Sequence, residues 1–176
     1  MEYSFSSLFP GARPHNLSAI LQQATFQDGW LKCRIEYDAS DYDLSVLPYE
    51  KATFNHIVFQ EIGSFTYPFK FADRAWINNF EKEVPDKTAL LFLKEGKVTD
   101  GAYFNVAFKN GDEWLTPYQP LLKGTCRERL IQNGTLQTAV IKKADLHWFS
   151  AVRLFNAMTG WEQAWELSME NAIFKG

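Results

Sequence analysis

The chain has 176 residues, of which 46% are hydrophobic and 22% charged, and this composition predicts one soluble globular domain or two small lobes. Its 18 Lys and Arg residues against 21 Asp and Glu residues give a net charge of −3, without a run of like charges that could bind nucleic acid or anionic lipid. We therefore expect no nucleic-acid partner. The chain opens on no secretion signal and contains no apolar stretch of the roughly 18 residues that a membrane helix needs, which predicts a cytoplasmic protein without a membrane partner.

The first third of the chain predicts a short helix and a strand. Apolar residues recur at helical spacing over 16–24, and Asn16 can cap that helix. Apolar and polar residues alternate over 30–37, which predicts a strand with Cys33 on its apolar face. An extended piece follows, and Pro48 near its end indicates a sheet edge or a connection.

The rest of the chain predicts short strands with a few short helices between them. The dipeptide Asn110-Gly111 is a strong signal for a hairpin. Asp100, which precedes Gly101, is predicted to lie in a loop. We therefore expect a mixed α/β or α+β fold with much antiparallel sheet. The predicted strands are 54–59, 88–93, 103–108, 113–116, 135–141 and 151–155, and the predicted helical segments start at Asp73, follow Gly124 and cover 144–149.

Lys70 is the first candidate for chemistry. It lies between Phe69 and Phe71 at the end of an apolar loop, where desolvation would favour its neutral, nucleophilic amine. A strand lysine that points to water is the plainer alternative.

Two later segments carry further candidates. Gly124-Thr125-Cys126-Arg127 brings a glycine, a hydroxyl and free backbone N–H groups to a helix start, which suits a phosphate but equally suits a plain helix cap. Asn156-Ala157 follows the last predicted strand and either adds small polar groups to the same site or forms only a turn. No metal site is expected, because the histidines fall on unlike elements and the two cysteines are far apart in the sequence.

Taken in order, five segments of the chain resemble the signature of the class IV aminotransferases, the pyridoxal-phosphate (PLP) family of fold type IV. This family includes branched-chain and D-amino-acid aminotransferases and aminodeoxychorismate lyase. The resemblance extends from about residue 8 to residue 160. The five segments are Phe69 to Arg74, Gly96 to Asn105, Leu115 to Pro117, Leu121 to Arg127 and Phe155 to Met158.

The resemblance implies a two-lobed α+β enzyme, with residues 1–49 as a partial, truncated small N-terminal lobe and residues 50–176 as the larger lobe, rich in antiparallel sheet. It implies PLP as cofactor, an amino acid and an oxo acid as substrates, and a homodimer. Transamination is the first expectation for the reaction, with an aminodeoxychorismate-lyase-like β-elimination as the nearest variant.

The resemblance also implies roles for individual residues. Lys70 stands at the family's Schiff-base lysine, which carries the cofactor and moves a proton during turnover. Asp100 stands where the family has a carboxylate against the pyridine nitrogen. Thr125 and Cys126 stand in the phosphate turn, where Cys126 replaces a hydroxyl.

Further positions follow from the same resemblance. Asn156 and Ala157 stand in the loop that completes the phosphate and substrate pocket. Arg34 is expected to meet a substrate carboxylate, because a guanidinium makes a two-pronged contact.

The front of the chain departs from the family pattern. The family has a His-x-x-Arg motif whose arginine binds the cofactor phosphate, whereas here Ser18 stands three residues after His15. The chain is thus expected to begin inside the family's first lobe, and cofactor affinity to fall. One alternative is therefore a non-catalytic remnant that holds no PLP. Another alternative, which sets the resemblance aside, is an aromatic-rich β module that binds a small apolar ligand.

Overall fold

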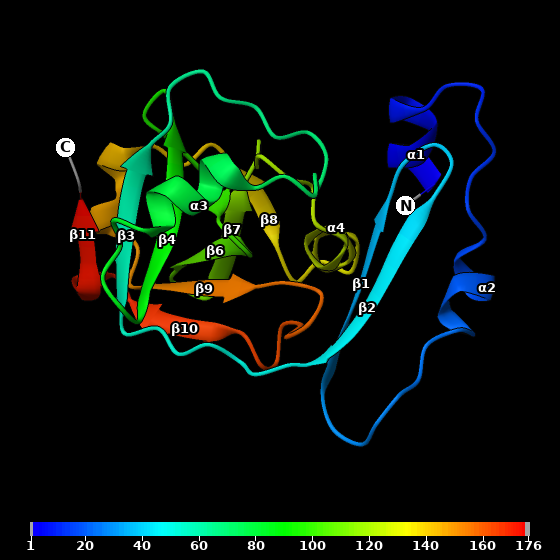
Figure 1. Cartoon of the computed structure of the whole chain (residues 1–176). Coiled ribbons are helices and arrows are strands. Elements are labelled where there is room, and N and C mark those ends of the chain that lie inside the picture. Colours follow the sequence, from blue (N-terminus) through cyan, green and yellow to red (C-terminus); the bar gives the residue numbers. More distant parts are fainter. Residues whose placement is uncertain (1, 175–176) are drawn as a thin grey trace. The chain divides into compact units, whose positions relative to one another are not determined.

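The computed structural model describes residues 2–174 of the chain. The chain divides into two compact units, Met1–Lys51 and Ala52–Gly176. Figure 1 shows both units, coloured by sequence from the N-terminus to the C-terminus.

The first unit combines two short helices with a two-stranded antiparallel sheet. Helix α1 covers Glu2–Leu8 and helix α2 covers Leu17–Leu21. The side chain of Asn16 accepts a hydrogen bond from the backbone N–H of Ala19 at 3.1 Å, which confirms the predicted cap. Strand β1 (Leu31–Tyr37) pairs with β2 (Tyr42–Pro48) along its whole length.

The strand predicted over 30–37 is confirmed as β1, but the side chains of its apolar face are not buried. Cys33 is exposed, as are its neighbours Lys32 and Arg34. Within this unit, aromatic packing concentrates at one end of the strand, where Phe5 stacks on Tyr37 with ring centroids 5.8 Å apart. A two-stranded ribbon has no second sheet to cover its remaining length, so its apolar residues stay accessible.

The second unit contains two sheets. Strands β11, β3, β4 and β5 form one sheet in that order, with β11, β3 and β4 parallel and β5 antiparallel to β4. Strands β10, β9, β6, β7 and β8 form the other, in which only β7 and β8 run parallel. The bounds are β3 His56–Glu61, β4 Thr88–Lys94, β5 Lys97–Gly101, β6 Asn105–Asn110, β7 Glu113–Pro117, β8 Gln137–Ala139, β9 Ala151–Phe155, β10 Trp165–Ser168 and β11 Ala172–Phe174.

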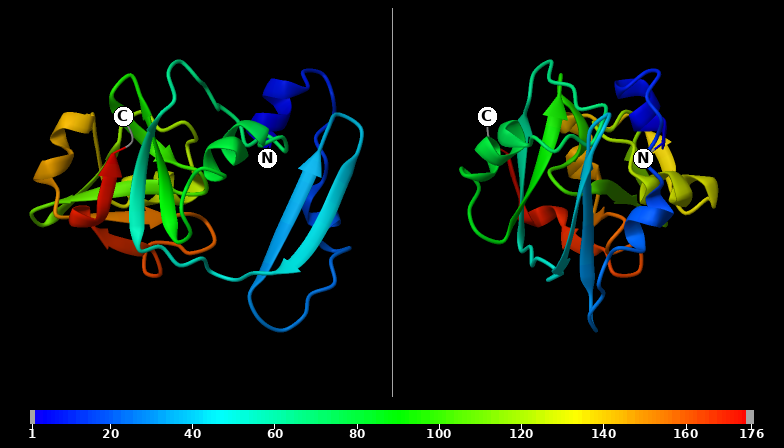
Figure 2. Two further views of the ribbon diagram at one scale, coloured as in Figure 1. Left: turned by 60° about the vertical axis from the view of Figure 1, so that its left-hand side comes forward. Right: turned by 45° about the vertical axis from the view of Figure 1, so that its right-hand side comes forward.

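Two α-helices and two short 3₁₀ helices complete the unit. Helix α3 covers Ala75–Glu81 and helix α4 covers Thr125–Gln132, with the 3₁₀ helices at Lys143–Trp148 and Met169–Asn171. Figure 2 gives two further views of these elements. The mixed α+β fold with much antiparallel sheet is confirmed.

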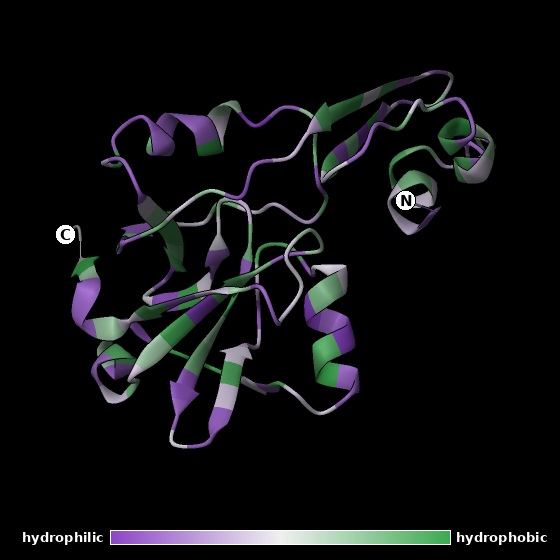
Figure 3. Cartoon of the chain, turned by 90° about the horizontal axis from the view of Figure 1, so that it is seen from below, coloured by the Kyte–Doolittle hydropathy of each residue, from purple (hydrophilic) through white to green (hydrophobic). Residues whose placement is uncertain are grey.

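The strand period of two explains how the layers pack. Leu91 and Leu93 of β4 enter the core between the two sheets, together with Val106 of β6. The alternate residues Leu90 and Phe92 face away from this core, toward α3. Figure 3 shows these strands as mainly hydrophobic and the turns between them as mainly hydrophilic.

Helix α4 is placed by the opposite face of the five-stranded sheet. Ala107 of β6 and Phe155 of β9 pack there against Cys126 and Leu130 of α4. The sheet thus has apolar residues on both faces. Thr125 and Cys126, the phosphate-turn candidates at the start of α4, lie in the same unit as Asp100 and Lys70.

Several strands differ from the sequence-based expectation. Asp100 lies in β5 and not in a loop, because residues 97–101 pair with β4. Strand β8 has three residues where seven were expected. Strands β10 and β11 were not predicted, and β11 owes its place to β3, more than 110 residues earlier in the chain. The predicted hairpin at Asn110-Gly111 is confirmed between β6 and β7.

Candidate active site

Asp100 is the one carboxylate among the predicted site residues, and it is buried. It is 3% exposed and lies near the end of β5. Its Oδ2 accepts a hydrogen bond from the backbone N–H of Leu122 at 3.0 Å and a longer one from Asn105 Nδ2 at 3.4 Å. Its other oxygen, Oδ1, is buried and has no hydrogen-bond partner among the described residues.

Burial raises the pKa of Asp100 to about 7. Desolvation is the main cause, and it is opposed by hydrogen bonds from the Leu122 and Leu121 backbone and by the positive charge of Arg127. The side chain therefore takes up or releases a proton near neutral pH. A buried carboxylate with one unpartnered oxygen is suited to hold a positively charged N–H group.

Asn105 joins Asp100 to the loop that precedes α4. Its Nδ2 donates to the Leu122 carbonyl at 2.9 Å as well as to Asp100. Gly124 leaves the room that this side chain needs, since a Cβ at Gly124 would lie 2.1 Å from Asn105 Oδ1. The glycine is thus required by close approach, and its φ of −70° is ordinary.

Arg127 places a buried positive charge beside this carboxylate. It is 3% exposed, and its Nη2 donates to the Pro117 carbonyl at 2.7 Å while Nη1 contacts Glu128 Oε1 at 2.6 Å. Its Nε donates to Thr116 Oγ1 at 3.3 Å. Sequence reasoning gave Arg127 and Asn105 no role, although both lie within the quoted motifs. For Asn105 the available signal was its place between Phe104 and Val106, whereas the polar residues around Arg127 gave no such signal.

The start of α4 presents backbone N–H groups. Gly124 is its N-cap and no side chain caps the helix there. Thr125 is exposed, whereas Cys126 is 3% exposed and packs its thiol against the apolar residues under the helix. The first N–H groups of a helix lack intrahelical partners and favour anions. Because the Cys126 thiol lies in the apolar cluster, the donors left for an anion are the Thr125 hydroxyl and the backbone N–H groups.

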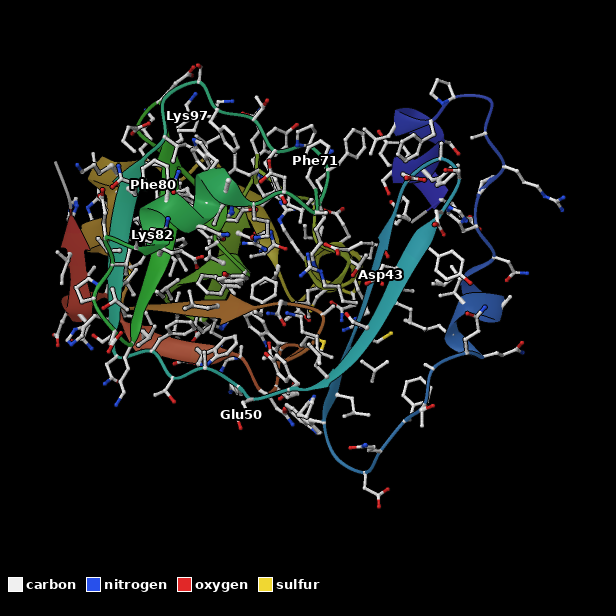
Figure 4. The ribbon with its side chains drawn as sticks, viewed as in Figure 1. Asp43, Glu50, Phe71, Phe80, Lys82 and Lys97 are labelled. Atoms are coloured by element: carbon white, nitrogen blue, oxygen red, sulfur yellow. The ribbon has the colours of Figure 1, made fainter. Side chains whose placement is uncertain are left out.

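Lys70 lies in the irregular loop before α3. Its side chain is exposed, so the dry setting expected from the flanking aromatic residues is wrong for this chain by itself. Phe71, labelled in Figure 4, is 40% exposed. A cavity of about 420 Å³ is lined from both sides of Lys70, by residues 65–67 and by residues 71–74, 76 and 77.

Hydrogen bonds connect the Lys70 loop to the segment after Asp100. Arg74 Nη2 donates to the Ala102 carbonyl at 2.5 Å. Asn156 Nδ2 donates to the Tyr103 carbonyl at 3.2 Å, and Asn156 Oδ1 accepts from the backbone N–H groups of Met158 and Thr159. The Asn156 side chain thus stabilises the turn that follows β9 and links this turn to Tyr103. The neighbouring Ala157 is exposed.

Arg34 lies in the other unit, exposed on β1. Its guanidinium pairs with Glu36 on the same strand. Arg34 thus belongs to the first unit, whereas the other predicted site residues all belong to the second.

A second cavity lies beside the carboxylate strand. It measures about 370 Å³ and is lined by Tyr67, Thr99 and Leu121 among others, which are neighbours of the Lys70 loop, of Asp100 and of Leu122. This volume is in the range of small-molecule sites. Within residues 2–174 there is no group of three or more His, Cys, Asp and Glu side chains that could hold a metal ion. No helix in that range is both long and apolar enough to cross a membrane.

Comparison with protein families gives one match to the larger unit. The family model of amino-transferase class IV matches residues 67–164. This range holds Lys70, Asp100 and the start of α4 but not Arg34.

Individual relatives cover more of the chain. An uncharacterised protein from Haemophilus influenzae is 34% identical over 149 residues, which span 82% of this chain and 78% of that protein. The crystal structure of a proposed 4-amino-4-deoxychorismate lyase from Haemophilus somnus 129PT is 31% identical, with a TM-score of 0.82 over 91% of this chain and 86% of that one. A proposed amino-acid aminotransferase from Mesorhizobium loti has a TM-score of 0.78 at 21% identity, covering 98% of this chain and 87% of that one, and this likeness concerns the fold.

Proposed function

Since this chain belongs to the class IV aminotransferase family, we propose that it is a PLP-dependent enzyme that moves an amino group between an amino acid and an oxo acid. The observation that carries the proposal is Asp100, a buried carboxylate whose Oδ1 has no partner among the described residues. A protonated pyridine nitrogen supplies the hydrogen bond that this oxygen lacks, so the residues present fit the cofactor. PLP, when bound, supplies an electron sink for the substrate's Cα.

Asp100 would accept a hydrogen bond from the protonated pyridine nitrogen of PLP and so keep that nitrogen protonated. The Leu122 N–H and the Asn105 amide fix its other oxygen, which leaves Oδ1 for the cofactor. A positive charge at Oδ1 lowers the pKa of Asp100 from its value near 7, because an opposite charge favours the ionised form. The positive charge of Arg127 acts in the same direction.

Lys70 would hold the cofactor through Nζ and carry a proton at that atom during turnover. The Lys70 side chain is exposed in this chain. The backbone N–H groups at the start of α4 and the Thr125 hydroxyl would bind the phosphate. Cys126 contributes its backbone N–H, since its thiol is buried in the core.

A β-elimination is the second candidate, and one observation favours it. The Haemophilus somnus protein, 31% identical, is a proposed 4-amino-4-deoxychorismate lyase. Both reactions use the same lysine and carboxylate and differ in what leaves the substrate. The substrate class is therefore the point that activity measurements must decide.

The test is a pair of assays on the protein after incubation with PLP. One follows amino transfer from a panel of amino acids to 2-oxo acids, and the other follows ultraviolet absorbance as 4-amino-4-deoxychorismate becomes aromatic. Activity in the first assay that Lys70→Ala abolishes supports the transaminase. Activity only in the second favours the lyase. Activity in neither, from a protein that takes up no PLP, favours the non-catalytic remnant.

We further propose a homodimer, on the expectation carried by the family. Its measurement is analytical ultracentrifugation of the full chain with and without PLP. A single species of twice the chain mass is expected, and a monomer at all concentrations would contradict it. A contribution of Arg34 to substrate carboxylate binding is part of the same proposal and is tested by the KM of Arg34→Met.

A further inference from the structure

Three segments that carry predicted site residues are in contact at Arg74 and Tyr103. They are the Lys70 loop, the end of the Asp100 strand and the loop that carries Asn156. Arg74 follows Lys70 by four residues and Tyr103 follows Asp100 by three. The Arg74 guanidinium lies over the Tyr103 ring, 4.2 Å from its centroid. Its Nη2 also donates to the carbonyl of Ala102, the residue before Tyr103. The arginine thus contacts both the ring and the backbone of the same short segment.

Tyr103 also forms hydrogen bonds with residues of two further segments. Tyr103 Oη donates to Glu81 Oε2 at 2.8 Å, which ties the ring to the end of α3. The Tyr103 carbonyl accepts from Asn156 Nδ2 at 3.2 Å, which ties the backbone to the loop after β9. A cation over an aromatic ring and a charged hydrogen bond are each stronger than a neutral contact at the surface.

We propose that Arg74 is a positioning residue that locks the Lys70 loop to the Asp100 strand and, through Tyr103, to the Asn156 loop. Arg74 touches neither cofactor nor substrate in this account. It acts by fixing the distance between an amine on a loop without regular structure and a carboxylate on a strand. This inference rests on the proposed function for its consequence in catalysis, whereas the coupling of the three segments stands on the contacts alone.

Burial explains why the arginine stays in this place. Arg74 Nε is buried and has no hydrogen-bond partner among the described residues, a state that costs free energy and persists only where other contacts hold the side chain. The ring of Tyr103 and the Ala102 carbonyl provide those contacts. Loss of the guanidinium therefore removes the anchor of the loop at its C-terminal end.

The test compares Arg74→Met with Arg153→Met in the full chain. Arg153 is a matched control, because its guanidinium also lies over aromatic rings, 4.9 Å from the Trp114 centroid and 4.6 Å from that of Trp161, and pairs with Glu166. None of those partners is a predicted site residue. Arg74→Lys keeps the charge without the planar group, and Tyr103→Ser removes the ring at a side chain that is 53% exposed, so that it folds even if Arg74→Met does not.

The first readout is amide hydrogen exchange in the absence of PLP. Arg74→Met is expected to raise exchange by about tenfold at Phe71 and also at Met158 and Thr159, whose N–H groups bond to Asn156. Tyr103→Ser should reproduce this pattern, Arg74→Lys should restore little, and Arg153→Met should leave the Phe71 amide unchanged. A rise confined to the Lys70 loop in Arg74→Met, or an equal rise at Phe71 in Arg153→Met, would overturn the coupling.

The second readout is the yield of borohydride-fixed PLP on Lys70. It should fall in Arg74→Met and Tyr103→Ser but not in Arg153→Met, and equal yields would overturn the positioning role. If wild-type Lys70 takes no label, the proposed function fails while the exchange result still decides whether the segments are coupled.

Discussion

The backbone N–H of Leu122 donates to Oδ2 of Asp100 at 3.0 Å, while Oδ1 of the same carboxylate is buried without a partner among the described residues. One half of the carboxylate is thus fixed by the protein, and the other half is left for a ligand. Because the loop that carries Leu122 runs directly into α4, the carboxylate and the candidate phosphate-binding helix start are held as one unit.

Asp100→Asn should make the cofactor-free protein more stable at neutral and alkaline pH while it weakens PLP binding. The pKa of Asp100 is raised from 3.8 to about 7 in the folded chain, so the contribution of Asp100 to stability is full below about pH 4 and is lost as the pH rises toward 7. The loss amounts to about 4 kcal/mol, since one pKa unit corresponds to about 1.4 kcal/mol. Asparagine does not ionise and should not show it.

Urea unfolding of both proteins from pH 4 to pH 8 measures this difference. The two stability curves should diverge as the pH rises. Parallel curves would show that Asp100 does not carry the raised pKa.

Gly124→Ala should destabilise the protein by about 1–3 kcal/mol, the usual cost of overpacking a filled site. The added methyl group would lie 2.1 Å from Asn105 Oδ1, so the side chain that holds Asp100 must move. A double-mutant cycle with Asn105→Ala checks the cause, because the methyl group should cost less once Asn105 is truncated. Additive effects would place the strain elsewhere.

Arg127→Met should cost about 3 kcal/mol or more, since it leaves buried acceptors at Pro117 and Thr116 without their donor. It also removes the positive charge that opposes the raised pKa of Asp100, so the pH-dependent loss of stability should move to higher pH. Arg129→Met, on an exposed side chain of the same helix, is the control. Thermal unfolding at several pH values measures both effects, and equal losses in the two variants would refute the role of burial.

Cys126→Ser should separate stability from cofactor binding. The thiol lies among apolar residues, so a hydroxyl there is expected to cost about 1–3 kcal/mol. The affinity for PLP, measured by fluorescence titration, should be unchanged, because the backbone N–H and not the thiol serves the phosphate. A gain in affinity would show instead that the side chain at 126 reaches the phosphate.

Local signals were enough to predict the elements that rest on neighbouring residues. The cap at Asn16 and the hairpin at Asn110-Gly111 depend on chemistry within a few positions, and both were found. Strand β11 was missed because its pairing with β3 is made by the distant chain and not by its own three residues. Asp100 was assigned to a loop because an aspartate followed by glycine is typical of turns, whereas pairing with β4 extends the strand to Gly101.

In the candidate site, too, some residues were predicted from the sequence and others are seen only in the folded chain. Lys70 and Asp100 were located by motif, and the structure supplies what the motif lacks: the burial of Asp100 and the exposure of Lys70. The support from Asn105 and Arg127 could not be derived from spacing, because each depends on how β6 and α4 approach β5. The contact between Arg74 and Tyr103 joins residues 29 positions apart and likewise required the folded chain.

The most direct measurement is borohydride reduction of the full chain after incubation with PLP, followed by digestion and mass spectrometry, with Lys70→Ala and Asp100→Asn in parallel. We expect a yellow wild-type protein whose label maps to Lys70, no specific label in Lys70→Ala, and a lower yield in Asp100→Asn. A colourless wild type, or a label spread over surface lysines and unaffected by either substitution, would contradict the assignment of this chain as a PLP enzyme.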